Sequence, residues 1–194
     1  MKNAALVLFL CVLLCAATGA NALGRDLTLR INSPQYRSGR ISSNVIVIGD
    51  ISYDTIDAIR NGITANLQVT FQILKVRGIF ESGKEVVGQR TKTYTISYDV
   101  WENRFVLTDK TRKRDHLADT PHALVHELGR VVNPLVAPLP SPGKGNRYMV
   151  RARIKIQTIK LFPPFGLFLY FFDPWNYDSE WVYSEVFSLE TAQE

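Results

Sequence analysis

The stretch Thr64–Val76 limits the possible folds of this chain more than any other part of the sequence. Apolar side chains occupy every second position from Ala65 to Ile73, and the positions between them are polar. A period of two over this length predicts a β-strand with one buried and one solvated face. At about 3.4 Å per residue the strand would be roughly 44 Å long. It therefore requires paired strands along both edges and a second layer over its apolar face.

Several other segments share this alternation, and two have a helical period. We predict short strands at Leu27–Ile31, Val45–Ile48 and Arg104–Thr108, the second buried on both faces. Longer strands are predicted at Lys92–Trp101, Arg147–Leu161 and Trp181–Ser188. In the last of these, Trp181, Tyr183 and Phe187 are expected on one face. Helices are predicted from Asp54, as N-cap, to Gly62 and over Thr120–Val132, and an extended linker at Pro134–Gly145.

Strands outnumber helices in this pattern. We therefore predict a mainly β fold with two short helices, arranged as an antiparallel β-sandwich or a strongly curved sheet.

The N-terminus has the pattern of a secretory signal peptide. A positive charge precedes the uncharged apolar run Ala4–Ala17, which is followed by small residues ending at Ala22. We therefore predict cleavage near Ala22, which removes residues 1–22 and leaves residues 23–194 as one periplasmic or secreted β-rich domain. Both cysteines fall in the removed part, so no disulfide or cysteine nucleophile is expected in the mature protein.

Four cations lie on the outward face of the predicted strand Arg147–Leu161. They form what we term the basic stripe: Arg147, Arg151, Arg153 and Lys155. Alternate strand positions are about 7 Å apart, so the row suits an anionic surface or an acidic envelope protein. The alternative is a solvated sheet face whose cations pair with carboxylates on a neighbouring strand. The formal net charge of +5 does not by itself indicate an anionic partner, and no nucleic acid is expected for an exported protein.

His122 and His126 have the spacing at which two imidazoles on one helix can bind a metal ion. The string that begins at His126 resembles the start of a zinc-protease helix. However, Arg130 stands where the second histidine is required, and a guanidinium group cannot ligate a metal. The two histidines either belong to a metal-dependent hydrolase or form a polar, solvent-facing arc of the helix without a metal. The arc is favoured, since two ligands are fewer than zinc sites use, and we predict no metal and no cofactor.

The stretch Leu161–Trp175 is rich in aromatic side chains. It forms either a strand buried on both faces or an exposed loop in contact with a membrane surface. Burial is favoured because so many exposed aromatic side chains would promote aggregation.

Four strings in the chain resemble those of a known family. They are Ala58-Ile59-Arg60-Asn61-Gly62-Ile63, Tyr94-Thr95-Ile96-Ser97-Tyr98-Asp99, Tyr148-Met149-Val150-Arg151-Ala152-Arg153 and Trp175-Asn176-Tyr177-Asp178-Ser179-Glu180-Trp181. In their order the chain resembles the exported bacterial proteins of domain of unknown function 4390. The resemblance implies a single exported domain in a Gram-negative envelope, with no established activity. Similar chains are often encoded beside a sensor kinase and its response regulator, which implies a link to envelope signalling.

No motif for nucleophilic catalysis, phosphate binding or dinucleotide binding occurs in the sequence. We therefore expect no catalytic residues and a non-enzymatic binding or protein-interaction domain that acts through the basic stripe. One alternative is a lipid- or membrane-surface-binding domain built on Leu161–Trp175. The other is a metal-dependent hydrolase that uses His122 and His126.

Overall fold

The structure is a computed structural model that describes residues 27–77, 83–139, 142–143, 145–158 and 176–189. The predicted signal peptide and the aromatic stretch Leu161–Trp175 lie outside these ranges. The described part is mainly β, with antiparallel sheets and two helices, as the sequence predicts. Neither helix in this part is long and apolar enough to cross a membrane.

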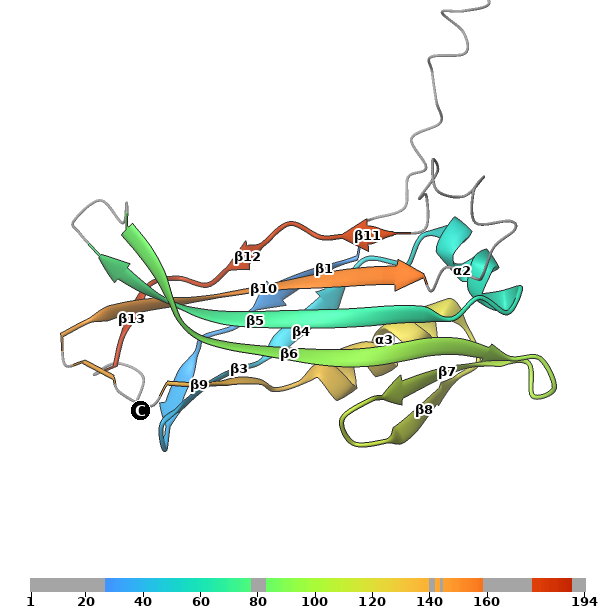
Figure 1. The fold of residues 1–194 in the computed structure, drawn as a ribbon, viewed down its shortest axis with the longest axis horizontal. Coiled ribbons are helices and arrows are strands. Elements are labelled where there is room, and N and C mark those ends of the chain that lie inside the picture. The colour runs from blue at the N-terminus through green and yellow to red at the C-terminus, as the bar shows by residue number, and fades with distance from the viewer. Residues whose placement is uncertain (1–26, 78–82, 140–141, 144, 159–175, 190–194) are drawn as a thin grey trace, which may run out of the picture.

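An eight-stranded antiparallel sheet forms one layer of the molecule (Figure 1). Three long strands, β10 (Arg147–Thr158), β5 (Ala65–Arg77) and β6 (Gly83–Asp99), are neighbours in this order, and β7 (Arg104–Asp109) and β8 (Arg114–Ala118) follow β6. Three short strands pair with the other edge of β10: β11 (Tyr177–Asp178), β12 (Val182–Tyr183) and β13 (Phe187–Ser188).

The alternation of β5 is confirmed. Its apolar side chains, from Ala65 to Ile73 at every second position, are 0% exposed. They lie on what we term the inner face of the large sheet, together with Val150, Ala152 and Ile154 of β10. The polar residues that alternate with these side chains, at positions 66–72 of β5 and 151–155 of β10, lie on the opposite, outer face.

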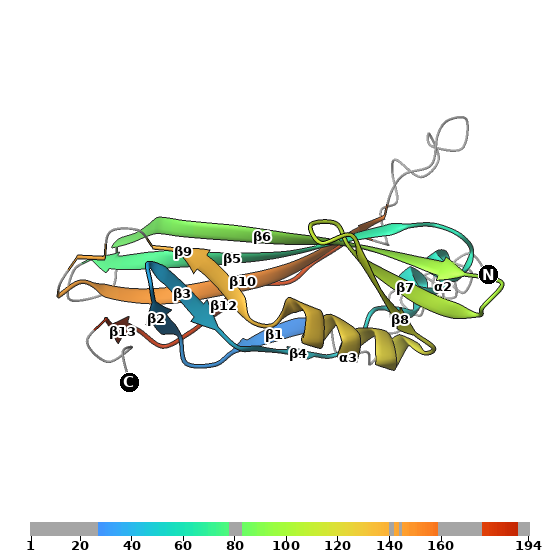
Figure 2. The same cartoon turned by 90° about the horizontal axis from the view of Figure 1, so that it is seen from below.

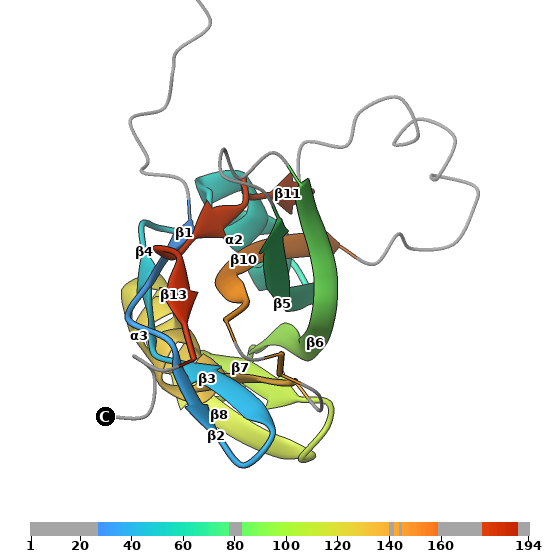
Figure 3. The same ribbon diagram turned by 90° about the vertical axis from the view of Figure 1, so that its left-hand side faces the viewer.

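The second layer covers the inner face (Figures 2 and 3). It consists of the pair β1 (Thr28–Ile31) and β4 (Val45–Ile48), the sheet β2 (Gln35–Arg37), β3 (Arg40–Ser43) and β9 (Leu135–Pro138), and helices α2 (Tyr53–Arg60) and α3 (Pro121–Val132). Leu29, Ile41 and Leu128 are buried in the core that the two layers share. The arrangement is a β-sandwich in which helices complete one layer.

Both helices begin at side-chain caps. Thr120 caps α3 as predicted, since its hydroxyl oxygen accepts the N–H of Ala123 at 3.1 Å. The predicted cap of α2 was wrong, because Ser52 is the N-cap and Asp54 lies in the first turn. A carboxylate in that turn is favoured by the positive end of the helix dipole.

The C-terminal end of α3 is bound by two side chains of β6. Lys92 Nζ donates to the carbonyl of Val132 at 2.6 Å, and Tyr94 Oη donates to that of Val131 at 3.1 Å. The last carbonyls of a helix have no partner within the helix, so these bonds both satisfy α3 and hold it against the sheet.

Some predicted strand boundaries and faces were wrong. β6 begins at Gly83, far before Lys92, and β9 lies inside the segment predicted as a linker. Ile46 of β4 is 48% exposed rather than buried on both faces, because only one face of the β1–β4 pair lies on the core. Neither the polar first half of β6 nor the proline-flanked β9 has the alternation that marks a strand.

The C-terminal edge segment, residues 176–189, pairs with β10 in a five-residue repeat. Ser179 and Ser184 have equivalent places: each N–H donates to a β10 carbonyl at 2.9 Å, that of Ile154 and that of Val150 respectively. Each serine hydroxyl oxygen also accepts the N–H of the same β10 residue at 3.0 Å. In each repeat the serine hydroxyl oxygen therefore accepts the β10 N–H that a backbone carbonyl of a regular paired strand would accept.

Each repeat contains a one-residue β-bulge. Asp178 is opposite Lys155, and Tyr183 is opposite Arg151, so the edge segment advances by five residues while β10 advances by four. The next step, from Tyr183 to Ser188 opposite Arg147, again takes five residues of the edge segment and four of β10. A single extra residue moves all side chains that follow to the other face of the sheet.

Candidate functional site: the basic stripe and its aromatic partners

The basic stripe lies on the outer face of β10, as predicted, but it is not continuous. Met149, between Arg147 and Arg151 on that face, is only 6% exposed. It packs with Leu74 of β5 and with Val186 of the edge segment. This small apolar cluster separates Arg147 from the other three cations.

Both central arginines of the stripe contact an aromatic ring of the edge segment. The Cζ atoms of Arg151 and Arg153 lie 4.2 Å and 4.5 Å from the centroid of the Trp181 ring. Arg151 Nη1 also donates to Tyr183 Oη at 3.3 Å, and Lys84 Nζ lies 5.1 Å from the Tyr183 ring centroid. We refer to these five residues as the cation–aromatic ladder.

The Asp178 carboxylate pairs with two cations of the stripe. Asp178 Oδ2 lies 3.4 Å from Arg153 Nη1 and 3.5 Å from Lys155 Nζ, and these side chains are between 35% and 40% exposed. Such exposed ion pairs contribute about 0–1 kcal/mol, and exposed cation–π contacts about 0.5–1 kcal/mol each. These contacts therefore orient the guanidinium groups more than they stabilise the fold.

The ladder continues into hydrogen bonds across the outer face. Arg151 Nε donates to Gln72 Oε1 at 2.8 Å, and Gln72 Nε2 donates to Gln89 Oε1 at 2.6 Å. One step along, the hydroxyls of Thr70 and Thr91 are 3.4 Å apart. The result is a polar surface that extends from the edge segment over β10 and β5 to β6.

Sequence reasoning found the cations but not their aromatic partners. The prediction that Trp181, Tyr183 and Phe187 share a face was wrong, because Phe187 packs on the inner face, with 6.4 Å between its ring centroid and that of Tyr148. The bulge at Ser184 causes this change of face. Its signal in the sequence is the Ser-Glu pair that occurs at 179–180 and again at 184–185.

The histidines of α3 lie on its exposed arc, as predicted for His122 and His126. Glu127, next to them, accepts hydrogen bonds from Arg130 Nη2 at 2.7 Å and Nε at 3.0 Å. The Nδ1 atom of His116 in β8 lies 3.8 Å from Glu127 Oε2. Among the described residues, no three His, Cys, Asp or Glu side chains are grouped to hold a metal ion.

Comparison with known proteins gave one family. The family model described as Domain of unknown function (DUF4390) matches residues 34–184, which include the basic stripe and the whole ladder. Neither a curated protein nor a solved structure matched the chain.

Proposed function

We infer that this chain, which belongs to the family described as Domain of unknown function (DUF4390), is a non-enzymatic binding domain of the bacterial envelope. Its partner is anionic and binds on the outer face at the ladder and Lys155. The envelope location rests on the predicted signal peptide, and the choice of partner rests on charge and geometry.

The observation that supports an anionic partner is the fixed position of two guanidinium groups. Arg151 and Arg153 are both held on the Trp181 ring, 4.2 Å and 4.5 Å from its centroid. A guanidinium group oriented by a ring loses less entropy when its edge N–H groups bind a carboxylate or phosphate. Among the described residues, Asp178 is shared between Arg153 and Lys155 and supplies one negative charge for these two cations.

The test is a double substitution of the ladder, Arg151→Gln with Arg153→Gln. Partners crosslinked in intact cells are recovered with the wild-type protein and with the variant. We expect about tenfold lower recovery for the variant, because two charge-assisted contacts are lost, and a steep loss of wild-type recovery with added salt.

The matched control is Arg37→Gln with Arg40→Gln. These two exposed arginines are paired opposite each other in the β2–β3 hairpin, so the control removes the same charge from the other layer. The proposal is wrong if both double variants lose the partner equally, or if neither does. Vesicles with and without phosphatidylglycerol show in parallel whether an anionic lipid surface is sufficient as the partner.

A further inference from the structure

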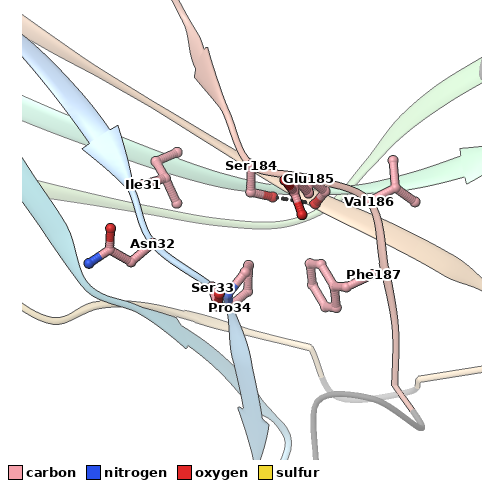
Figure 4. A pocket seen from close by; sticks show the side chains of 8 residues that line it. All are labelled: Ile31, Asn32, Ser33, Pro34, Ser184, Glu185, Val186 and Phe187. Carbon is pink, nitrogen blue, oxygen red and sulfur yellow. Dashed lines mark hydrogen bonds between the residues drawn. The ribbon is translucent and has the colours of Figure 1, made fainter.

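A pocket of about 450 Å³ lies beside the second bulge of the edge segment (Figure 4). One wall is formed by Ile31–Pro34 and the other by Ser184–Phe187. Figure 4 shows the Phe187 ring directed toward Pro34 across the space between the two walls. We refer to it as the edge pocket. Its volume is in the range of pockets that hold ligands.

The first wall presents backbone groups that β4 does not use. The N–H of Asn32 donates to the carbonyl of Asn44 at 2.9 Å, so Asn32 is a hydrogen-bonded position of the β1–β4 pair. In an antiparallel pair such positions alternate with positions whose N–H and C=O point away from the partner. The backbone N–H and C=O of Ile31, the last residue of β1, therefore point away from β4.

The second wall presents backbone groups that β10 does not use. The N–H of Val150 is satisfied by the Ser184 hydroxyl oxygen at 3.0 Å, and pairing with β10 resumes at Phe187. Glu185 and Val186 lie between these two attachments and have no β10 partner in the register. The Glu185 carbonyl accepts the Ser184 hydroxyl at 2.7 Å. A bulge leaves its extra residue outside the sheet pairing, so the N–H groups of Glu185 and Val186 can donate to another strand.

We refer to the line along which β1 faces the edge segment as the seam. The two come together at the end of the seam that lies away from the edge pocket. Tyr177 Oη donates to the carbonyl of Leu27 at 2.7 Å, and β1 contacts β12 along the way. In the described residues β1 and the edge segment belong to different sheets and share no strand pairing. The seam is therefore closed at Leu27 and opens into the edge pocket.

We propose that the edge pocket binds an extended peptide segment that carries a cationic side chain. Two unused strand edges can hold such a segment by main-chain hydrogen bonds, as in other cases of strand addition. Glu185 is exposed and is the one charged side chain among the eight described residues that line the pocket. It selects a lysine or arginine, while Ile31 and Phe187 contact the apolar positions of the peptide. The site is separate from the ladder, whose partner has the opposite charge.

The test uses a capped heptapeptide of alternating Thr and Val with a central Lys, titrated into the ¹⁵N-labelled protein. We expect saturable shifts of the amide signals of Ser33, Glu185 and Val186, with a dissociation constant in the millimolar range. The same peptide with a central Glu should bind at least about fivefold more weakly. A version with Pro in place of alternate residues should not bind, because it lacks the N–H donors of a strand.

Two protein variants provide a matched pair. Glu185→Gln should weaken binding of the lysine peptide about fivefold. Glu180→Gln should leave it unchanged, because Glu180 follows Ser179 in the equivalent repeat and does not line the pocket. No amide shifts, equal effects of both variants, or equal binding of the proline peptide would each overturn the proposal. The ladder variant Arg151→Gln with Arg153→Gln should bind the lysine peptide normally, so the two proposals fail separately.

Discussion

Lys92 and Tyr94 are polar side chains that point into the inner side of the sheet. Both find acceptors there, since the carbonyl end of α3 receives their hydrogen bonds at 2.6 Å and 3.1 Å. Burial lowers the pKa of Lys92, and the nearby Arg112 guanidinium lowers it further. Burial also raises the pKa of Tyr94 above its usual value of 10.0, and the Asp109 carboxylate adds to that rise. The two groups therefore affect alkaline stability in opposite directions.

Tyr94 should make the folded protein sensitive to alkali. Above pH 10 the unfolded state loses the phenol proton while the folded state keeps it, so the free energy of unfolding should fall by about 1.4 kcal/mol per pH unit. Lys92 acts the other way only below 10.5, its unperturbed pKa, since there the unfolded state holds more protons. In the Tyr94→Phe variant, the fall in the free energy of unfolding above pH 10 should disappear. Urea unfolding between about pH 10 and 11.5 measures it, and an unchanged slope in the variant would contradict the assignment.

At the scale of single elements, β5 and β10 could be predicted because one face of each is buried and the other is solvated along its length. The first half of β6 could not, since Lys84 to Gln89 show no alternation and the strand is specified by pairing with β5. The histidine arc of α3 was also predictable, because a helical period depends on local spacing alone. The ladder was not, because the face of Tyr183 depends on a bulge formed with a distant strand.

The serines of the bulged edge should contribute unequally to stability. Ser179 is 6% exposed, so Ser179→Ala leaves the buried N–H of Ile154 without its acceptor, and we expect a loss of about 1–3 kcal/mol. Ser184→Ala should cost less, since the Ser184 site is only partly buried and water can replace the hydroxyl. Urea unfolding of both variants gives the comparison. A larger loss for Ser184→Ala would show that the two bulges are not equivalent as described.

At the scale of the whole molecule, the two layers are in close contact where β6 passes β9. A Cβ atom on Gly88 would meet the carbonyl oxygen of Pro138 and, at 2.9 Å, Ile73 Cδ1. Neither neighbour can move freely, because one is backbone and the other is a side chain that is 0% exposed. The spacing of the layers at this point therefore depends on a glycine.

Gly88→Ala should destabilise the sandwich by about 1–3 kcal/mol through this overpacking. Gly129→Ala is the matched control, because its Cβ would lie 3.7 Å from Val47 Cγ2, an ordinary contact. Within helix α3 that change should instead stabilise the protein by about 0.5–1 kcal/mol. Thermal and urea unfolding of both variants measure the sign. If Gly88→Ala left the free energy of unfolding unchanged, the two layers could move apart at this point without a loss of stability.

In the edge segment, five residues span the same length as four residues of β10. This register restricts how the edge segment can change in length. Removing one residue near Glu180 would turn Trp181 and Tyr183 toward the interior and Phe187 toward water, since each unpaired residue reverses the orientation of everything downstream. Relatives that gain or lose residues in this tail are therefore expected to do so in compensated pairs. Single insertions should instead accumulate in the connections between strands.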